Sequence, residues 1–244
     1  MIKFLDILKE SDDNIFIPRG SKEEKDKVLI RRTNDKILEY IKNGSEGTLS
    51  LFRSPIKFLP RNLTKVGGDL DLMYSQIEKL PDNFTVNGTL DLRQCKNLQS
   101  LPNGLKVKFT LNLRGTNITS LPSDLQVGKN LILMYSQIEK LPDNFTVNES
   151  LDLEGCKNLQ SLPDNLRVNG YLDLNNCKNL ESLPNGLKVK DFLNLRDTNI
   201  TSLPSDLEVG YGLLLLRTPI ARMYTEKQIR KMVPGVKGNI HLYL

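Results

Sequence analysis

The sequence has little of what most enzymes use at their active sites. Its 244 residues contain no tryptophan, one histidine and three cysteines. A nucleophile with its base, or a zinc ligand set, needs several such residues at defined spacings. We find no phosphate-binding loop, no HExxH and no GxSxG in the chain. We therefore expect no catalytic residue, no metal site and no cofactor, and a protein that is not an enzyme.

Long apolar runs and a secretory signal are also missing. No stretch of 18 apolar residues occurs, which excludes a membrane-spanning helix. The N-terminal segment MIKFLDILKE places four charged residues among its apolar ones, so it lacks the apolar core of a signal peptide. Three cysteines without such a signal favour a reducing compartment over a disulfide framework. These features predict a cytoplasmic protein.

The charges are nearly balanced over most of the chain. Lys and Arg exceed Asp and Glu by five, and three of these excess charges fall within residues 225–244, which hold four basic groups and one acidic group. This distribution is not the footprint of a dedicated nucleic-acid binder. Binding of nucleic acid through the basic tail is therefore only an alternative hypothesis, with Lys227, Arg230, Lys231 and Lys237 as its residues.

Internal repetition dominates the sequence. A Leu-x-Leu pair recurs every 20 or 21 residues, beginning at Leu49, Leu70, Leu90, Leu111, Leu131, Leu151, Leu172, Leu193 and Leu213. An Ile or Leu and then a Leu-Pro pair follow in every unit but the last. Some units are near copies, since MYSQIEKLPDNFTVN occupies residues 73–87 and again residues 134–148. Such a constant period predicts a stack of similar structural units.

The repeated unit, L-x-L-x-x-[S/T/C]-x-[I/L]-x-x-L-P-x-x-L-x-V, resembles the short leucine-rich repeats of bacterial proteins. The resemblance covers roughly residues 48–224, in about nine units. It implies an α/β horseshoe-shaped solenoid with a parallel β-sheet on its concave face and extended or 3₁₀ segments on its convex face. We expect a helical N-terminal cap over residues 1–47, the leucine-rich-repeat solenoid over 48–224, and a C-terminal cap helix with a closing strand over 225–244.

The alternation within each unit favours the same architecture. Both leucines of Leu-x-Leu point to one face of a strand and the middle residue to the other. Each return to the next strand is short and contains a proline, which disfavours a long convex helix. A small residue follows each strand, where the family usually has an asparagine that bonds to loop backbone: Ser54, Ser75, Cys95, Thr116, Ser136, Cys156, Cys177, Thr198 and Thr218. We expect these side chains to be buried and to donate to backbone carbonyls.

The N-terminal part predicts helix. Ser21-x-x-Glu24 is a capping-box signature that opens a helical stretch, with a break near residues 31–33 and a restart at Asn34. The apolar face of this stretch comprises Val28, Leu29, Ile37, Leu38 and Ile41. Residues 1–9 favour a short amphipathic helix that helps to cover the first repeat, with docking on a partner or a membrane surface as the alternative.

The C-terminal part predicts a second capping box and a last strand. Thr225-x-x-Gln228 opens a helix that we expect to run to about Met232. The segment 240–242 repeats the Leu-x-Leu pattern, which places His241 on the inner surface of the sheet. A lone histidine in such a position is more typical of a contact residue than of a catalyst.

Function in such a solenoid is expected on the concave face, where side chains are free of the core. Strands about 4.8 Å apart make this face roughly 40 Å long, which suits a protein or peptide better than a small molecule. One patch combines carboxylates with arginine, tyrosine and methionine, the types that are enriched in interface cores. The candidate partner-binding residues are Asp71, Met73, Tyr74, Asp91, Arg93, Arg114, Met134 and Tyr135. Simple duplication of the unit is the alternative origin of the patch.

The sequence thus predicts a monomeric, non-catalytic module that binds a protein or peptide partner, whose identity it does not give. An adaptor-like effector, secreted by a bacterium into the host cytosol, is the alternative that the resemblance adds. Some effectors of that type carry a ubiquitin-ligase domain beyond their repeats. Only about twenty residues follow the last unit, so we expect that enzyme to be absent here.

Overall fold

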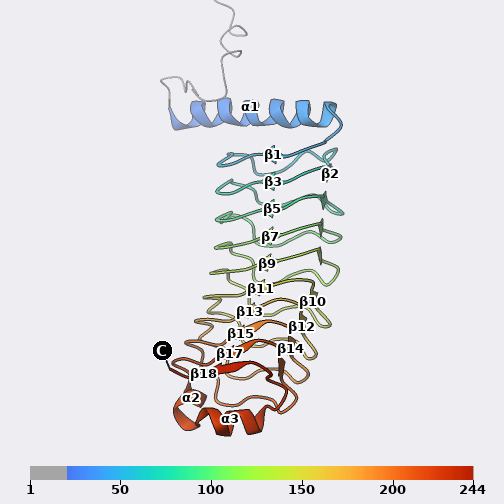
Figure 1. Ribbon diagram of the computed structural model, residues 1–244. Helices are drawn as coiled ribbons and strands as arrows, with labels where there is room; N and C mark the ends of the chain where they lie inside the picture. The colour runs from blue at the N-terminus through green and yellow to red at the C-terminus, as the bar shows by residue number, and fades with distance from the viewer. Residues whose placement is uncertain (1–20, 244) are drawn as a thin grey trace, which may run out of the picture.

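The chain folds into a stack of parallel strands that recur every 20 or 21 residues. Figure 1 shows the computed structural model, which describes residues 21–243. Within these residues a ten-stranded parallel sheet runs along the whole stack in sequence order. Its strands are β1 (Leu49–Ser50), β3 (Leu70–Asp71), β5 (Leu90–Asp91), β7 (Leu111–Asn112), β9 (Leu131–Ile132), β11 (Leu151–Asp152), β13 (Leu172–Asp173), β15 (Phe192–Asn194), β17 (Gly212–Leu214) and β18 (Asn239–His241). The register pairs the first leucine of one unit with that of the next, as the Leu-x-Leu period predicts.

Two four-stranded parallel sheets form a second side of the stack. The first contains β2 (Lys65–Val66), β4 (Thr85–Val86), β6 (Lys106–Val107) and β8 (Gln126–Val127). The second contains β10 (Thr146–Val147), β12 (Arg167–Val168), β14 (Lys188–Val189) and β16 (Glu208–Val209). The sequence predicted extended or 3₁₀ segments in these returns. The structure confirms extended segments and adds that they pair as strands, with the valine of each unit in register with the valine of the next.

The second side is interrupted between β8 and β10, which do not pair. In neighbouring units the valine carbonyl accepts a backbone N–H from the next unit, as Val107 O does from Gly128 N at 2.9 Å. At the interruption Val127 O accepts from the side-chain amide of Asn148 at 3.0 Å. A side chain therefore satisfies the carbonyl where the strand ladder stops.

The core is one continuous cluster that extends from the first unit to the last. Both leucines of each Leu-x-Leu pair are buried, as are the apolar residues before and after each proline, apart from Leu203. No unit could bury these residues alone, so each depends on its neighbours for stability.

The small residue after each strand is buried, as predicted. Cys95 Sγ donates to Leu72 O at 3.0 Å, and Thr116 Oγ1 donates to Leu113 O at 2.8 Å. Cys156 and Cys177 make the same kind of bond to the carbonyls of Leu133 and Leu153. None of the three cysteines forms a disulfide, and all three are buried, which fits their predicted role in packing.

Helix α1 (Lys22–Lys42) lies across one end of the stack, next to β1 (Figure 1). The predicted capping box is present, with Glu24 N donating to Ser21 Oγ. The predicted break and restart at Asn34 were wrong, because the helix is continuous through residues 31–34, where Thr33 Oγ1 donates to Leu29 O at 2.8 Å. Leu38, placed by the sequence on the apolar face, is exposed. The segment 1–9 lies outside the described residues.

Contacts between α1 and the first unit centre on three side chains. Ile37 is fully buried in the core cluster, and Ile41 packs against it. Tyr40 donates its hydroxyl to Ser45 O at 2.7 Å and accepts from Gly67 N at 3.1 Å. Burial raises the pKa of Tyr40, and the hydrogen bond from Gly67 offsets part of that effect.

At the other end lie α2 (Pro219–Met223) and α3 (Glu226–Met232), below β18 in Figure 1. The Thr225 capping box and the end of α3 at Met232 confirm the prediction. The short helix α2 was not predicted. It forms where the last unit lacks the Leu-Pro pair, with Thr218 as its N-cap and Pro219 in its first turn. None of the helices in residues 21–243 has the length and apolarity needed to cross a membrane.

Candidate binding surface

The outward surface of the ten-stranded sheet, here called the ten-stranded face, presents the middle residue of each Leu-x-Leu. All nine middle residues are half-buried, whereas the leucines on either side of them are buried. These side chains have no packing role in the core, so they are available for binding. Three positions after each middle residue, the turn contains a residue with left-handed backbone, such as Tyr74 (φ 59°) and Tyr135 (φ 55°).

Asp91 and Arg93 form the best-defined polar pair among the predicted site residues. Arg93 Nε donates to Asp91 Oδ2 at 2.9 Å, and Nη2 donates to the same oxygen at 2.5 Å. This hydrogen bond raises the pKa of Arg93. Asp71, on the neighbouring strand, accepts from Ser50 Oγ at 3.2 Å and from Met73 N at 3.0 Å. The carboxylates of this half of the face are therefore hydrogen-bonded within the chain.

Tyr74 contacts two residues that the sequence did not select, Phe52 and Arg53. Its ring meets that of Phe52 edge to face, with centroids 6.2 Å apart. The guanidinium of Arg53 lies 5.0 Å from the Phe52 ring centroid and 5.6 Å from that of Tyr74. Phe52 and Arg53 occupy the same positions in their unit as Met73 and Tyr74 do in theirs. This equivalence could have identified them from the sequence.

Arg114 and Tyr135 form a second cluster. The Arg114 guanidinium lies 5.6 Å from the centroid of the Tyr135 ring. The Tyr135 hydroxyl donates to Glu154 Oε1 at 2.5 Å, and this bond raises the pKa of Tyr135. Gly155, at φ 68°, leaves the room that the Tyr135 ring occupies, because a Cβ there would overlap the ring. Glu154 was not among the predicted residues.

The predicted residues divide into separate sets of contacts. Asp71 and Asp91 are register partners on β3 and β5, and Arg93 bonds to Asp91. Arg114, in the next unit, contacts Tyr135 of the unit after it. Met73 and Met134 are half-buried and Tyr74 belongs to an aromatic cluster of its own.

The C-terminal half of the face carries exposed aromatic rings that the sequence did not flag. They are Tyr171, Phe192 and Tyr211. Tyr171 and Phe192 come directly before the first leucine of their units, so by alternation they share a face with the middle residue. Extending the period-2 pattern by one residue toward the N-terminus would have found both of them.

In this half, Asp152 and Asp173 have raised pKa values and, unlike Asp91, form no ion pair among the described residues. Burial, together with the charges of Asp173 and Glu154, raises the pKa of Asp152 to about 6. Burial also raises the pKa of Asp173, although Asn194 Nδ2 donates to both of its oxygens at 3.1 Å. Within residues 21–243, none of these three acids forms an ion pair.

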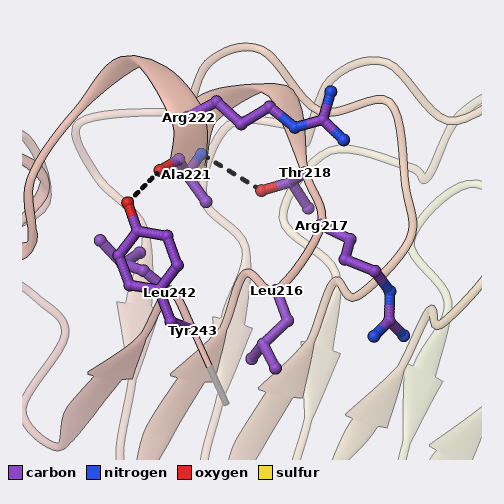
Figure 2. Close-up of a pocket in the computed structure, with 7 residues that line it drawn as sticks. All are labelled: Leu216, Arg217, Thr218, Ala221, Arg222, Leu242 and Tyr243. Atoms are coloured by element: carbon purple, nitrogen blue, oxygen red, sulfur yellow. Dashed lines mark hydrogen bonds between the residues drawn. The ribbon is translucent and has the colours of Figure 1, made fainter.

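A small apolar pocket lies at the C-terminal end of the stack (Figure 2). It has a volume of about 330 Å³ and is lined by Leu216, Arg217, Thr218, Ala221, Arg222, Leu242 and Tyr243. The Tyr243 hydroxyl donates to Ala221 O at 3.3 Å, while both arginine side chains extend away from the Tyr243 ring (Figure 2). No set of polar groups converges on this pocket in the described part of the chain, so it does not have the composition of a catalytic site.

The cysteines and the single histidine lie apart from these clusters in character. Burial raises the pKa of Cys156 to about 11 and also raises those of Cys95 and Cys177, which disfavours their thiolates. His241 lies exposed on β18, on the face where the sequence placed it. Between residues 21 and 243, no three His, Cys, Asp or Glu side chains gather in a way that could hold a metal ion.

The scan against protein-family models found no match, and no curated protein is significantly similar to the chain in sequence. What the molecule shows directly is a repeat solenoid of stacked parallel strands, with a row of exposed aromatic and charged side chains along its ten-stranded face.

Proposed function

We propose that the chain is a non-catalytic binding module of the leucine-rich-repeat type, which holds a protein or peptide partner on its ten-stranded face. The observation that carries the proposal is the set of exposed aromatic and arginine side chains that contact one another on a rigid sheet. Phe52, Arg53 and Tyr74 form one such cluster, and Arg114 with Tyr135 forms another. Tyrosine and arginine on a fixed backbone provide contact area at a small entropic cost on binding.

The repeated unit supports the leucine-rich-repeat assignment. Leucines before and after each middle residue fill the core, and a small buried residue after the strand donates to the backbone, where that family has asparagine. The ten-stranded face, at about 4.8 Å per strand, is long enough to hold an extended segment or a domain surface.

The binding function can be tested with matched arginine variants. We would immobilise the protein, capture partners from cells of its natural source, identify them, and measure their affinity directly. Arg93→Ala with Arg114→Ala should weaken that affinity by about tenfold or more, as for interface arginines. Arg61→Ala with Arg167→Ala removes the same charge from exposed positions outside the face and should leave the affinity unchanged. Equal losses in both pairs would contradict the proposal.

We also propose that α1 caps the first unit of the solenoid. Ile37 lies in the core cluster, and Tyr40 bonds to the backbone of two different loops. Deleting residues 1–45 would bare Leu49, Leu51 and Ile56 and should cost several kcal/mol, so the protein should aggregate or unfold at a lower temperature. Deleting residues 240–244 should cost less. Thermal melting of both truncated proteins measures this, and unchanged melting without α1 would contradict the cap.

Binding of nucleic acid through the basic tail loses part of its support. Arg230 Nη2 donates to Glu226 Oε1 at 2.9 Å and to Gly238 O at 3.1 Å, so this arginine is used inside the fold. Three lysines of the four predicted cations remain. A weak dependence of duplex DNA binding on salt concentration would remove this alternative, because phosphate contacts give a steep one.

A further inference from the structure

The C-terminal half of the ten-stranded face differs in chemistry from the patch that the sequence selected. We define the acidic–aromatic surface as Asp152, Glu154, Tyr171, Asp173, Phe192 and Tyr211. Three of these residues lie on β11, β13 and β15, and the other three lie just before or after β11, β13 and β17. The four strands are adjacent in the sheet. The surface is therefore a continuous part of one rigid face.

The aromatic part of this surface is exposed and ordered by the sheet. Tyr171 is 41% exposed, Phe192 47% and Tyr211 64%. The register of β13 with β15 places Tyr171 beside Phe192. The rings of Phe192 and Tyr211 stack with centroids 6.0 Å apart, and Gly212 leaves the space that the Phe192 ring fills. Three large rings thus remain open to solvent on neighbouring units.

Among the described residues, the acidic part forms no ion pair. Asp152 and Asp173 are register partners on β11 and β13, so their carboxylates lie side by side. Asp152 accepts from the backbone N–H of Glu154 at 3.1 Å, and Asp173 from that of Asn175 at 2.8 Å. The charges of Arg114 and Arg196 offset only part of the effect of burial on the pKa values of Asp152 and Asp173, respectively.

One further polar atom points to a missing donor. Asn175 Oδ1 is buried and accepts no hydrogen bond in the described chain. Asn175 follows Asp173 on the face at the position that Arg93 holds after Asp91. In the unit of Asp173 this position holds an acceptor instead of the donors that Arg93 supplies to Asp91. The following unit has Arg196 there, and its Nε is likewise buried without a hydrogen-bond partner among the described residues.

We propose that the acidic–aromatic surface binds a basic segment of the protein partner, with a lysine or arginine side chain placed over Asp152 and Asp173 and against the ring of Tyr171. This inference rests on the proposed binding function and adds the chemistry of the partner. Two adjacent carboxylates without an ion-pair partner attract a positive group. The exposed rings favour contact with the aliphatic stem and the charge of that group. Phosphate groups would be repelled, so the occupant is a basic polypeptide and not a nucleic acid.

The test uses the whole chain and a pair of fluorescein-labelled probe peptides of equal length. One peptide alternates arginine with serine and tyrosine, and the other has glutamate in place of arginine. Fluorescence anisotropy at low ionic strength should show binding of the arginine peptide and none of the glutamate peptide. Asp152→Asn with Asp173→Asn should lower the affinity for the arginine peptide by about fivefold, the loss expected for partly exposed ion pairs.

A matched pair of variants controls for overall charge. Asp82→Asn with Asp164→Asn removes the same charge from exposed turns outside the ten-stranded face and should leave peptide binding unchanged. Tyr171→Ala should also lower the affinity for the arginine peptide, while the melting temperature stays close to that of the parent protein. Equal effects of the two aspartate pairs, or equal binding of both peptides, would overturn the inference. If spermine displaced the arginine peptide with an affinity equal to that of the peptide, the surface would be a site for small polycations. That result would also overturn the inference.

The captured partner separates this inference from the proposed function. If the Arg93 and Arg114 variant loses the partner but the Asp152 and Asp173 variant binds it unchanged, the basic-segment inference fails and the binding function stands. If neither variant affects the partner, the function of the ten-stranded face itself fails. Loss of the partner in the aspartate variant, but not in its Asp82 and Asp164 control, supports both.

Discussion

Two segments of this protein have the same fifteen residues and different surroundings. Residues 73–87 and 134–148 both read MYSQIEKLPDNFTVN. Their backbones agree closely, since Tyr74 and Tyr135 have φ of 59° and 55° and Asn83 and Asn144 have φ of 55° and 56°. The local sequence therefore determines the local conformation, turn by turn.

Their contacts do not agree. Tyr74 packs on Phe52 and Arg53, whereas Tyr135 lies against Arg114 and donates to Glu154. Strand β4 pairs on both sides, but β10 pairs only with β12. Since each unit contacts mainly its neighbours, those neighbours decide what an identical segment does. A copied residue can thus acquire a different partner without any change in its own unit.

The largest effect on stability is expected from substitution of the buried phenylalanines of the two segments. Phe84 is 0% exposed and Phe145 8% exposed, next to the interruption of the second side. Phe84→Ala should cost about 3–5 kcal/mol of unfolding free energy, and Phe145→Ala about 1 kcal/mol less, because its site is partly open and can relax. Urea unfolding followed by circular dichroism measures both. An equal or larger loss at Phe145 would mean that the interruption does not loosen the packing.

A smaller effect concerns Asp152, one unit beyond the second copy. Its pKa is raised to about 6 from 3.8, so the folded chain binds this proton more tightly than the unfolded chain. Stability should therefore fall as pH rises between these two values, and remain lower above them. The charged groups that influence this carboxyl are Asp173, Glu154 and Arg114.

Asp152→Asn removes that dependence. After allowance for solvent screening of this half-buried group, the variant should be about 1 kcal/mol more stable near pH 7 and no more stable near pH 4. Melting temperatures across this pH range test it, with Asp82→Asn as the control. A destabilised variant at neutral pH would show that the carboxylate is needed in its charged form.

The smallest effect compares Asn87 with Asn148, the last residues of the two copies. Asn87 donates its backbone N–H to Val66 O at 2.9 Å, whereas Asn148 uses its side-chain amide on Val127 O. Asn148→Ala should cost about 0.5–1 kcal/mol, and Asn87→Ala less, because only the first removes a hydrogen bond to a carbonyl. The difference in urea midpoints gives the answer. Equal midpoints would assign no stabilising role to the Asn148 side chain.

Period-2 leucines and the constant unit length were enough to predict the parallel register and the buried small residue after each strand. The predicted bond to a backbone carbonyl is made by the cysteines and threonines at this position, whereas the serines bond to other groups. The continuous helix through Thr33 and Asn34 was not predicted, because helix propagation outweighed a weak local signal. Pairing of the valine strands depends on stacking between units, which one unit cannot show. The contacts of Tyr135 and the raised pKa of Asp152 were also missed, because both arise from residues of neighbouring units.

The central claim is that the ten-stranded face holds a protein partner. Oxidative footprinting of the free and partner-bound protein tests this directly, since Tyr74, Tyr135 and Tyr171 are exposed on that face and Phe58 is exposed outside it. We expect the partner to protect the three tyrosines and to leave the oxidation of Phe58 unchanged. Protection of Phe58 with no change at the tyrosines would contradict the claim and place the partner elsewhere on the solenoid.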